Sequence, residues 1–348
     1  MPAKPRKEPY PEPVAVLLSQ GDASAAQQLA ALAEDAEKPL AKAARRALHQ
    51  LRLIGVEPPA RPFTAATTQA RSDTRAQKAW MSTPSALGRR VLLFVWEDPG
   101  GGSSILVEAL LDDEGGLTEI SGSSMGRRRI QEHLERLKSR ETWVLEEVPV
   151  DWARHVMRDA VRLAHATRST QPDGTSRWMR VVGEPDRDYP VHPVYGVLDP
   201  AAVQADPRVS ADAAQLFTEK PFSSWFLEPQ RMAPAMERLA AVLDSKLVLE
   251  EHQKRERVDR MLAEAADELL TGEEMARWQR RLEDSAFVLH FAGNEDAAKR
   301  AVKHALSISP EQPPREQPFF VNLVERSLAL VYAMLERHQE KSRPGSAA

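Results

Sequence analysis

The hydrophobic pattern is strand-like in one stretch of the chain, residues 89–120, and helix-like almost everywhere else. Residues 91–96 (VLLFVW) form an unbroken apolar run, which is typical of a strand buried on both faces and central in its sheet. Residues 105–111 resume the apolar pattern after a proline- and glycine-rich break, and residues 117–120 do so after a polar turn at 112–116. Such breaks between short apolar runs predict β-hairpins. We therefore expect an antiparallel meander.

Two further segments extend the predicted sheet, and two helices accompany it. Residues 78–83 end before Pro84, and they and residues 142–148 have the composition of strands. Residues 127–138 and 151–167 carry apolar side chains three and four positions apart, which is the helical period. The predicted fold class is α+β and mostly α, with a central antiparallel β-meander, packed helices and helical modules on both flanks.

Three short helices are predicted near the N-terminus, at residues 14–18, 23–33 and 39–54. The third has alanine and leucine along one face and mostly basic side chains along the other. Its segment LAKAARRALHQLRLIGV resembles the second helix of a HEAT-type repeat, a family in which an alanine- and leucine-rich face stacks on neighbouring units. The resemblance implies a stacked helical module, and the alternative is a plain helical bundle cap.

The C-terminal third predicts five helices, at about residues 229–243, 250–270, 272–292, 295–308 and 318–339. The segment RLEDSAFVLHFAGNEDAAKRAVKHALSISP resembles one tetratricopeptide unit, because it places small, large, turn and terminal residues at that family's spacing: Ala286, Leu289, Gly293, Ala298, Ala305 and Pro310. It departs from the family at Leu282 and Glu295. The resemblance implies a protein or peptide partner, and a single helical hairpin without repeat ancestry is the alternative.

At 348 residues the chain is long enough for several domains. We expect these segments: a disordered N-terminus at 1–12, a HEAT-like module at 13–56, a linker at 57–77, a central α+β domain at 78–228 that includes a long ordered loop region at 169–212, a helical domain at 229–340 and a disordered tail at 341–348.

The composition, 42% hydrophobic and 28% charged, is that of an ordinary water-soluble protein. The chain has no cysteine, which excludes disulfides, thiolate metal sites and cysteine nucleophiles. No apolar run approaches the roughly 20 residues of a membrane span, so we predict a cytoplasmic protein that does not bind membranes. Residues 1–80 contain 12 basic and 8 acidic side chains and the net charge of the whole chain is −4. No domain has the basic surplus of a dedicated nucleic-acid binder.

The one catalytic motif is at residues 122–126 (GSSMG), which match the G-x-S-x-G pattern of a hydrolase nucleophile elbow. In that interpretation Ser124 is the nucleophile, Asp186 or Asp188 the acid and His192 the base. Two short glycine-containing turns nearby indicate antiparallel strands, whereas a hydrolase fold needs a mainly parallel sheet. A cap of the following helix by Ser123 or Ser124 is therefore the favoured interpretation.

Two groups of arginines are candidate binding residues. Arg127, Arg128 and Arg129 begin a predicted helix, where the helix dipole disfavours cations. They are interpreted either as a solvated ion-pair cluster with the glutamates of the next turns or as a site for an anion or an acidic partner. Arg45 and Arg46 lie on the basic face of the third helix, which could meet nucleic acid or an acidic partner.

The sequence favours a non-catalytic protein-interaction or scaffold protein with a protein or peptide partner, no cofactor and no metal. The first alternative is a nucleic-acid or ribonucleoprotein accessory that binds through its basic patches. The second alternative is a serine hydrolase that uses Ser124. The oligomeric state stays open.

Overall fold

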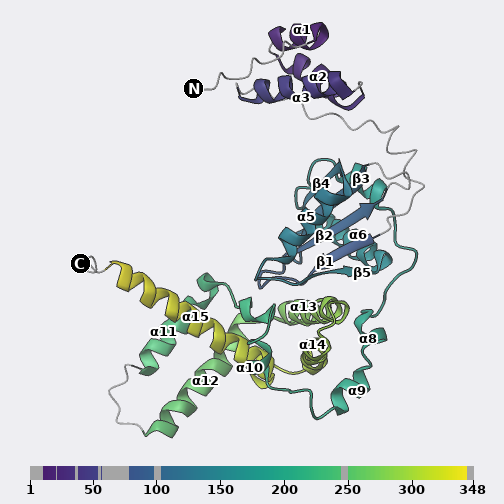
Figure 1. The fold of residues 1–348 in the computed structure, drawn as a ribbon. Coiled ribbons are helices and arrows are strands. Elements are labelled where there is room, and N and C mark those ends of the chain that lie inside the picture. The colour runs from purple at the N-terminus through teal and green to yellow at the C-terminus, as the bar shows by residue number, and fades with distance from the viewer. Residues whose placement is uncertain are drawn as a thin grey trace, which may run out of the picture. The chain divides into compact units, whose positions relative to one another are not determined.

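The computed structural model divides the chain into two compact units, residues 1–73 and 74–348 (Figure 1). The structure describes residues 11–20, 22–35, 38–53, 56, 78–97, 103–243 and 250–342. Several predicted features lie outside the described residues: most of the two disordered ends, the linker at 57–77, the end of the third helix at Ile54 and Gly55, and the first hairpin break before Ser103.

The first unit contains three helices around a small apolar core. They are α1 (Glu12–Gln20), α2 (Ala23–Asp35) and α3 (Lys38–Leu53), as the sequence predicts. Alanines and leucines of α2 and α3 pack against Val14 and Leu17 of α1. The Asp22 carboxylate accepts a hydrogen bond of 2.7 Å from the Ala25 N–H and so caps α2. The resemblance to a HEAT repeat stays a prediction.

The second unit is built on one antiparallel sheet with the strand order β4-β3-β2-β1-β5. The strands are β1 (Lys78–Ser82), β2 (Arg90–Trp96), β3 (Ser104–Asp112), β4 (Gly116–Met125) and β5 (Leu145–Val148). β2 is the middle strand and every residue in it is buried. The predicted meander with a central β2, and with it the α+β fold class, is confirmed.

Strand β4 is longer than the sequence predicts. It was expected to end at Ile120, but it continues to Met125, with Ser124 opposite Ile105 and Met125 opposite Ser104 of β3. Residues 121–124 are serine and glycine, so they lack the apolar alternation by which a strand is recognised. Their pairing with the apolar strand β3 makes them extended.

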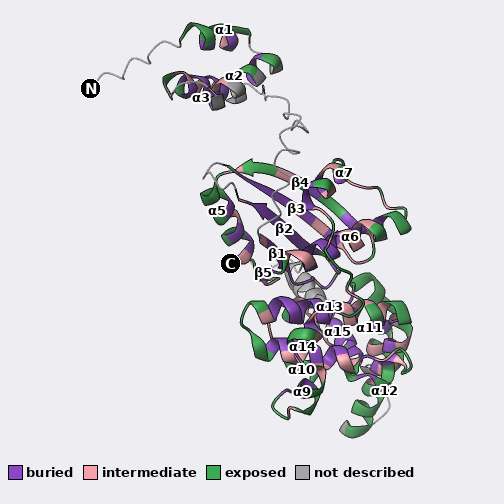
Figure 2. Cartoon of the chain, turned by 90° about the vertical axis from the view of Figure 1, so that its right-hand side faces the viewer, coloured by how far each residue is buried: buried purple, intermediate pink, exposed green. Residues whose placement is uncertain are grey.

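Helices cover both faces of the sheet (Figure 2). Alternate side chains of each strand point to opposite faces, so both faces have side chains against which a helix can pack. α5 (Arg127–Lys138) packs on one face through Ile130, Leu134 and Leu137, against a cluster that includes Val91, Leu93 and Val95 of β2. α6 (Val150–Ala166) and α7 (Thr175–Val182) contact the sheet on the other face.

The turn between β3 and β4 fixes where α6 meets the sheet. The Asp112 carboxylate accepts hydrogen bonds of 2.9 Å from the N–H groups of Glu114 and Gly115, and Gly116 has a φ of +80°. A Cβ atom at Gly116 would lie 2.3 Å from the Ala160 carbonyl oxygen of α6. Only glycine permits both this φ and this approach, so the predicted glycine turn also determines the packing of a helix.

The segment after α6 is more helical than the predicted loop region. It contains α7, α8 (Val194–Val197), α9 (Pro200–Ala205), α10 (Ala213–Leu216) and the 3₁₀ turn η1 (Phe222–Ser224). Each is at most eight residues long, which is too short for the helical period to show in the sequence. Buried side chains such as Trp178, Val182 and Phe222 hold these short elements.

Helices form the rest of the second unit, close to the predicted positions. They are α11 (Pro229–Leu243), α12 (Glu251–Leu269), α13 (Gly272–Phe291), α14 (Glu295–Ser307), the 3₁₀ turn η2 (Pro314–Glu316) and α15 (Pro318–Ser342). α13 and α14 form a hairpin whose turn uses Gly293, with a φ of +75°. α13 also contacts β1 and β5, so residues 78–228 and 229–340 fall within one compact unit. Among the described residues, no helix is long and apolar enough to cross a membrane.

Candidate functional site

A buried ionic network joins the sheet to α13. Arg90, the first residue of β2, forms an ion pair with Asp284 of α13, and the two side chains are 8% and 0% exposed. The Arg280 Nε atom lies 3.7 Å from the same carboxylate, and His192 Nε2 lies 3.2 Å from its other oxygen. Asp284 therefore faces three potential cation partners, and the pair with Arg90 links residues that are 194 positions apart.

The hydrogen bonds of His192 define its tautomer. The Val194 N–H donates to Nδ1 at 3.1 Å, so Nδ1 is an acceptor and Nε2 carries the proton that is donated to Asp284. Burial lowers the pKa of His192 below its ordinary value, although the bond to Asp284 acts to raise it. His192 is therefore neutral at pH 7.

Asp284 stays ionised although it is fully buried. Burial by itself raises the pKa of this carboxyl, but the charge of Arg90, the hydrogen bond from His192 and the charge of Arg280 outweigh it. The pKa of Asp284 consequently lies below its usual range. An ionised carboxylate held in this way is a structural anchor for its neighbours, and removing it would leave Arg90 charged and buried without a partner.

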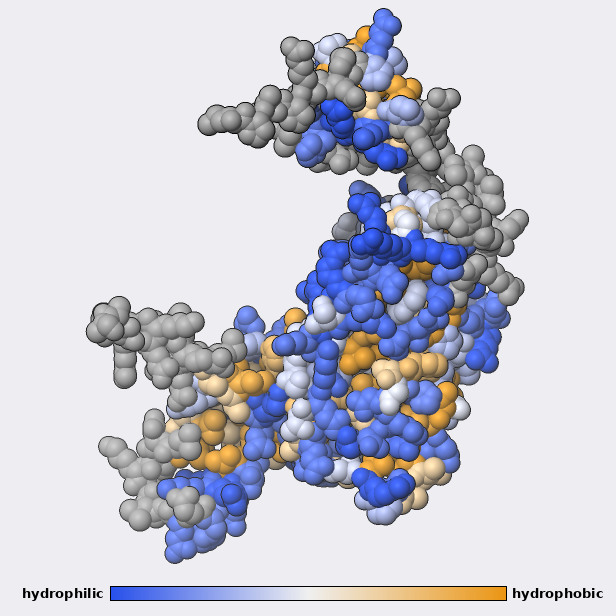
Figure 3. Space-filling view, in the orientation of Figure 1, coloured by the Kyte–Doolittle hydropathy of each residue, from blue (hydrophilic) through white to orange (hydrophobic). Residues whose placement is uncertain are grey.

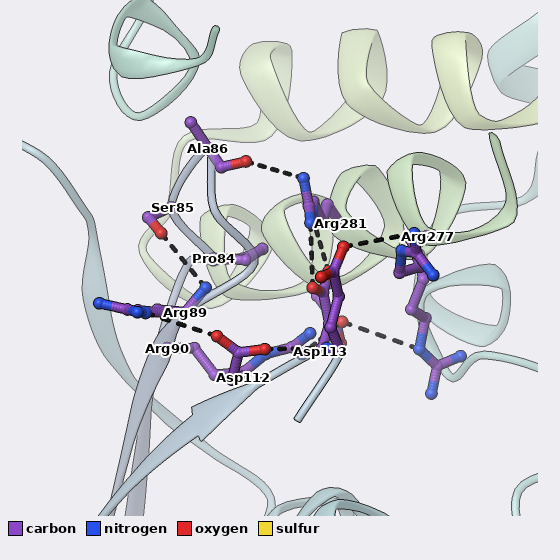
Figure 4. Close-up of polar contacts among 12 residues, drawn as sticks. Pro84, Ser85, Ala86, Arg89, Arg90, Asp112, Asp113, Arg277 and Arg281 are labelled. Carbon is purple, nitrogen blue, oxygen red and sulfur yellow. Dashed lines mark hydrogen bonds and ion pairs between the residues drawn. The ribbon is translucent and has the colours of Figure 1, made fainter. Parts of the chain in front are cut away.

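A second ionic contact lies beside the first, where the β1–β2 and β3–β4 turns meet α13 (Figure 4). Arg281 donates to both carboxylate oxygens of Asp113, at 2.6 and 2.9 Å, and to the Ala86 carbonyl oxygen at 2.8 Å. Arg277 forms an ion pair of 3.3 Å with Glu114 on the same turn. The guanidinium of Arg281 therefore holds both turns of the sheet against α13.

The pockets around this network have nearly balanced charges. A pocket of about 190 Å³ is lined by Arg90, Arg280, Asp112, Asp113 and Asp159 among others. A cleft of about 320 Å³ beside Arg281 is lined by four arginines that face four acids: Arg89, Arg231, Arg277, Arg281, Asp112, Glu114, Glu228 and Glu274. Because these charges compensate each other, the network is better suited to joining the sheet and the helices than to binding an ion.

The structure does not bring the candidate catalytic residues together. Ser124 lies inside β4 and not in a turn, and its hydroxyl donates to the Ser103 hydroxyl at 2.8 Å. Both ring nitrogens of His192 are occupied by Asp284 and Val194. Arg90, whose partner Asp284 also contacts His192, is opposite Leu111 of β3, whereas Ser124 is opposite Ile105. Arg90 and Ser124 are therefore about 20 Å apart along the sheet at ~3.3 Å per residue. Asp186 donates its backbone N–H to Asp151.

The expected serine cap of α5 is also absent. The N-cap residue is Gly126, which has no side chain to accept a hydrogen bond from the first turn. The backbone N–H groups at this helix start are therefore left without a side-chain cap, and Ser123 and Ser124 belong to β4 instead. The interpretation of either serine as a helix cap is wrong, because the strand continues through both.

Arg127, Arg128 and Arg129 are exposed at this uncapped helix start. Arg127 lies 3.4 Å from Glu97 and Arg128 lies 2.9 Å from Glu132, while the two arginine side chains remain 60% and 92% exposed. Among the described residues, no ion pair involves Arg129. The two ion pairs are on the surface and contribute little to stability, so the cluster keeps most of its positive charge available to solvent.

A groove begins beside this cluster, between α5 and the sheet. Its volume is about 350 Å³, and its lining includes Arg127, Lys78, Trp80, Lys138 and Ser104. Ser104 is fully buried, and its hydroxyl has no hydrogen-bond partner within the described part of the chain. A buried hydroxyl without a partner is costly. Of the three arginines in the cluster, Arg127 lines this groove.

The other predicted binding residues lie in the first unit. The Arg45 side chain donates from Nη2 to the Ala33 carbonyl oxygen at 3.1 Å, which ties α3 to the end of α2. The side chain of Arg46 is half-buried and also makes contacts. Arg45 therefore has a structural role in this unit in addition to any role in binding.

No protein-family model, no curated protein and no solved structure matches this chain. Within the described ranges, no group of three or more histidine, aspartate or glutamate side chains is placed to hold a metal ion.

We expect the protein to lose stability as the pH falls below about 6.5. Burial is the main cause that lowers the pKa of His304 to about 4, and the pKa of His192 is lowered in the same way. Unfolded histidines bind protons below about pH 6.5, whereas these buried ones do so only at lower pH, so stability is present above pH 6.5 and is lost toward pH 4. From His304 alone the loss between pH 7 and pH 5 is about 2 kcal/mol.

Urea unfolding at pH 7 and pH 5 measures this loss. His304→Phe should reduce the difference between the two pH values, because the variant has no proton to bind in the unfolded state. An unchanged difference in His304→Phe would contradict the assignment to His304.

Proposed function

We propose that this chain is a non-catalytic intracellular protein-interaction protein, and that it binds an acidic segment of a partner protein through Arg127, Arg128 and Arg129. The observation that carries the proposal is the placement of three exposed guanidinium groups on the uncapped N-terminus of α5. Cations at a helix N-terminus cost about 0.3–1 kcal/mol each. An acidic partner would remove this cost, because its carboxylates would meet both the arginines and the free N–H groups.

Two features of the surroundings support a macromolecular partner. The adjoining groove is lined by Lys78 and Lys138 together with Arg127, and the surface over α5 is broadly hydrophilic (Figure 3). Bidentate arginine–carboxylate pairs provide geometric selectivity as well as charge. A segment with several carboxylates in a row fits three successive arginines better than a single small anion does.

Charge reversal of the cluster tests the proposal. In Arg127→Glu/Arg128→Glu/Arg129→Glu, binding of a fluorescent glutamate-rich decapeptide should weaken by at least about tenfold, because attraction becomes repulsion. Fluorescence anisotropy measures the binding, and circular dichroism checks that the variant is folded. The matched control is Arg255→Glu/Arg257→Glu/Arg260→Glu, which changes the net charge equally on exposed positions of α12. Equal binding by the two triple variants would reject the proposal.

An oligonucleotide titration and an esterase assay discriminate between the alternative functions. If the partner is a nucleic acid, a single-stranded oligonucleotide should bind more tightly than the decapeptide and with a steep salt dependence. A serine hydrolase would lose ester hydrolysis in Ser124→Ala. The pairing of Ser124 in β4 and the engagement of both nitrogens of His192 favour neither attack by this serine nor proton transfer to this histidine.

A further inference from the structure

Strand β4 has an outer edge without a strand partner. It lies at the end of the strand order, and among the described residues it forms no backbone hydrogen bonds with any element other than β3. Its residues Thr118, Glu119, Ser121, Ser123 and Ser124 are exposed. Sheets usually protect such edges with lysine, proline or a covering element, and β4 contains neither lysine nor proline. The opposite edge strand, β5, is only four residues long and contacts α13.

A groove lies beside β4, on the face of the sheet that α5 covers in part. Its volume is about 560 Å³, and it is lined by apolar side chains that include Leu110, Leu137 and Trp143 and by acidic ones. The acidic lining residues are Glu108, Glu119 and Asp173, and they outnumber the one arginine, Arg140, which stacks on Trp143 at 4.9 Å. The Glu108 carboxylate also contacts His133, with Oε2 lying 2.9 Å from Nε2. The groove therefore favours a partner with apolar and basic side chains.

The two ends of the β4 edge carry opposite charges. Glu119 lies near its start, and Arg127–Arg129 follow its last residue, Met125. The seven residues from Glu119 to Met125 span about 20 Å of extended chain. An extended segment beside β4 would thus meet negative charge at one end and positive charge at the other.

We propose that the partner of this chain docks as an extended segment that adds a sixth strand to the edge of β4. The segment carries basic side chains where it passes Glu119 and the acidic groove, and acidic side chains where it reaches Arg127–Arg129. Backbone hydrogen bonds to β4 provide affinity, and the two charged ends select one orientation. The contact between the acidic end of the segment and Arg127–Arg129 rests on the proposed function. The strand pairing is inferred independently, from the unpaired edge of β4 and the groove beside it.

Two synthetic peptides with opposite orientation test the strand addition. EEVTVTVKVK places its acidic end at Arg127–Arg129 when it runs antiparallel to β4, and KVKVTVTVEE does so when it runs parallel. Fluorescence anisotropy should give saturable binding for one of them and at least about tenfold weaker binding for the other. Absence of saturable binding by both peptides, up to about 1 mM, would overturn the proposal.

Backbone methylation of the peptide that binds provides the decisive signature. Two versions are made, one with N-methyl groups on the odd-numbered amides and one with them on the even-numbered amides. In an added strand only alternate amides face the neighbour, so one version should lose at least about tenfold in affinity and the other should change little. Equal effects of the two versions would show that the peptide is not paired as a strand.

Substitutions in the protein separate this inference from the proposed function. Glu119→Lys should weaken binding of the peptide at least about fivefold. Glu184→Lys, which changes an exposed acid outside the groove, should not.

If the Arg127–Arg129 reversal has no effect but the methylation pattern persists, the proposed function fails and the strand addition stands. If the reversal abolishes binding but both methylated versions bind equally, the strand addition fails alone. A dimer in sedimentation velocity that Glu119→Lys dissociates would identify a second copy as the occupant and overturn the peptide proposal.

Discussion

Asp284→Ala should lower the free energy of unfolding by about 3–5 kcal/mol, which is the cost of leaving a buried charge without its partner. The substitution removes the only carboxylate that pairs with Arg90 among the described residues, and it also removes the acceptor of the His192 proton. Both neighbours are buried, at 8% and 1% side-chain exposure, so water cannot replace the lost contacts. Urea unfolding followed by tryptophan fluorescence measures the change.

The control for this prediction is Asp188→Ala. Asp188 also pairs with an arginine, Arg158 at 2.9 Å, but its side chain is 83% exposed, and a surface pair of this kind contributes about 0–1 kcal/mol. Asp284→Asn, which keeps the shape and removes the charge, should also destabilise the protein strongly. If Asp284→Ala costs no more than Asp188→Ala, the network does not anchor α13 to the sheet.

Gly116→Ala should destabilise the protein by about 3 kcal/mol, from backbone strain and from overpacking together. The φ of +80° disfavours any side chain, and the new Cβ atom would lie 2.3 Å from the Ala160 carbonyl oxygen and 2.5 Å from the Ala164 nitrogen. These are backbone atoms of α6, which can give way only if the helix separates from β4. Thermal unfolding compares the variant with the wild type.

Gly272→Ala is the matched control for Gly116→Ala. Gly272 is the first residue of α13, and nothing lies within 4 Å of a Cβ atom placed there. Alanine is the better helix former, so this substitution should be neutral or slightly stabilising. Equal destabilisation by the two substitutions would mean that the approach of α6 to Gly116 is not what matters.

Features of the fold that depend on local periodicity could be predicted from the sequence. The apolar run at 91–96 identified the central strand, and the spacing of Ile130, Leu134 and Leu137 identified α5. Elements without a pattern of their own were missed. α7 has only eight residues, and the second half of β4 is polar and extended because of its pairing with β3.

The candidate sites divide in the same way. The exposed cluster Arg127–Arg129 was found because three arginines at a helix start contradict the helix dipole, which is a local feature. The pair between Arg90 and Asp284 could not be found, because it depends on a tertiary contact across 194 positions. One local hint existed: charged residues 281, 283 and 284 interrupt the most buried part of α13, and charges in such positions are usually paired.

The salt dependence of acidic-peptide binding tests the central claim most directly, because it reports the charges of Arg127, Arg128 and Arg129 and no other property of the surface. Isothermal titration of the glutamate-rich decapeptide is carried out at about 0.05 M and about 0.5 M salt with the wild type and with Arg127→Gln/Arg128→Gln/Arg129→Gln. The wild type should bind at low salt and weaken by about tenfold or more at high salt, since screening acts on exposed pairs. The glutamine variant should bind weakly at both. Equal Kd values for the two proteins at low salt would contradict the claim that this cluster is the binding site.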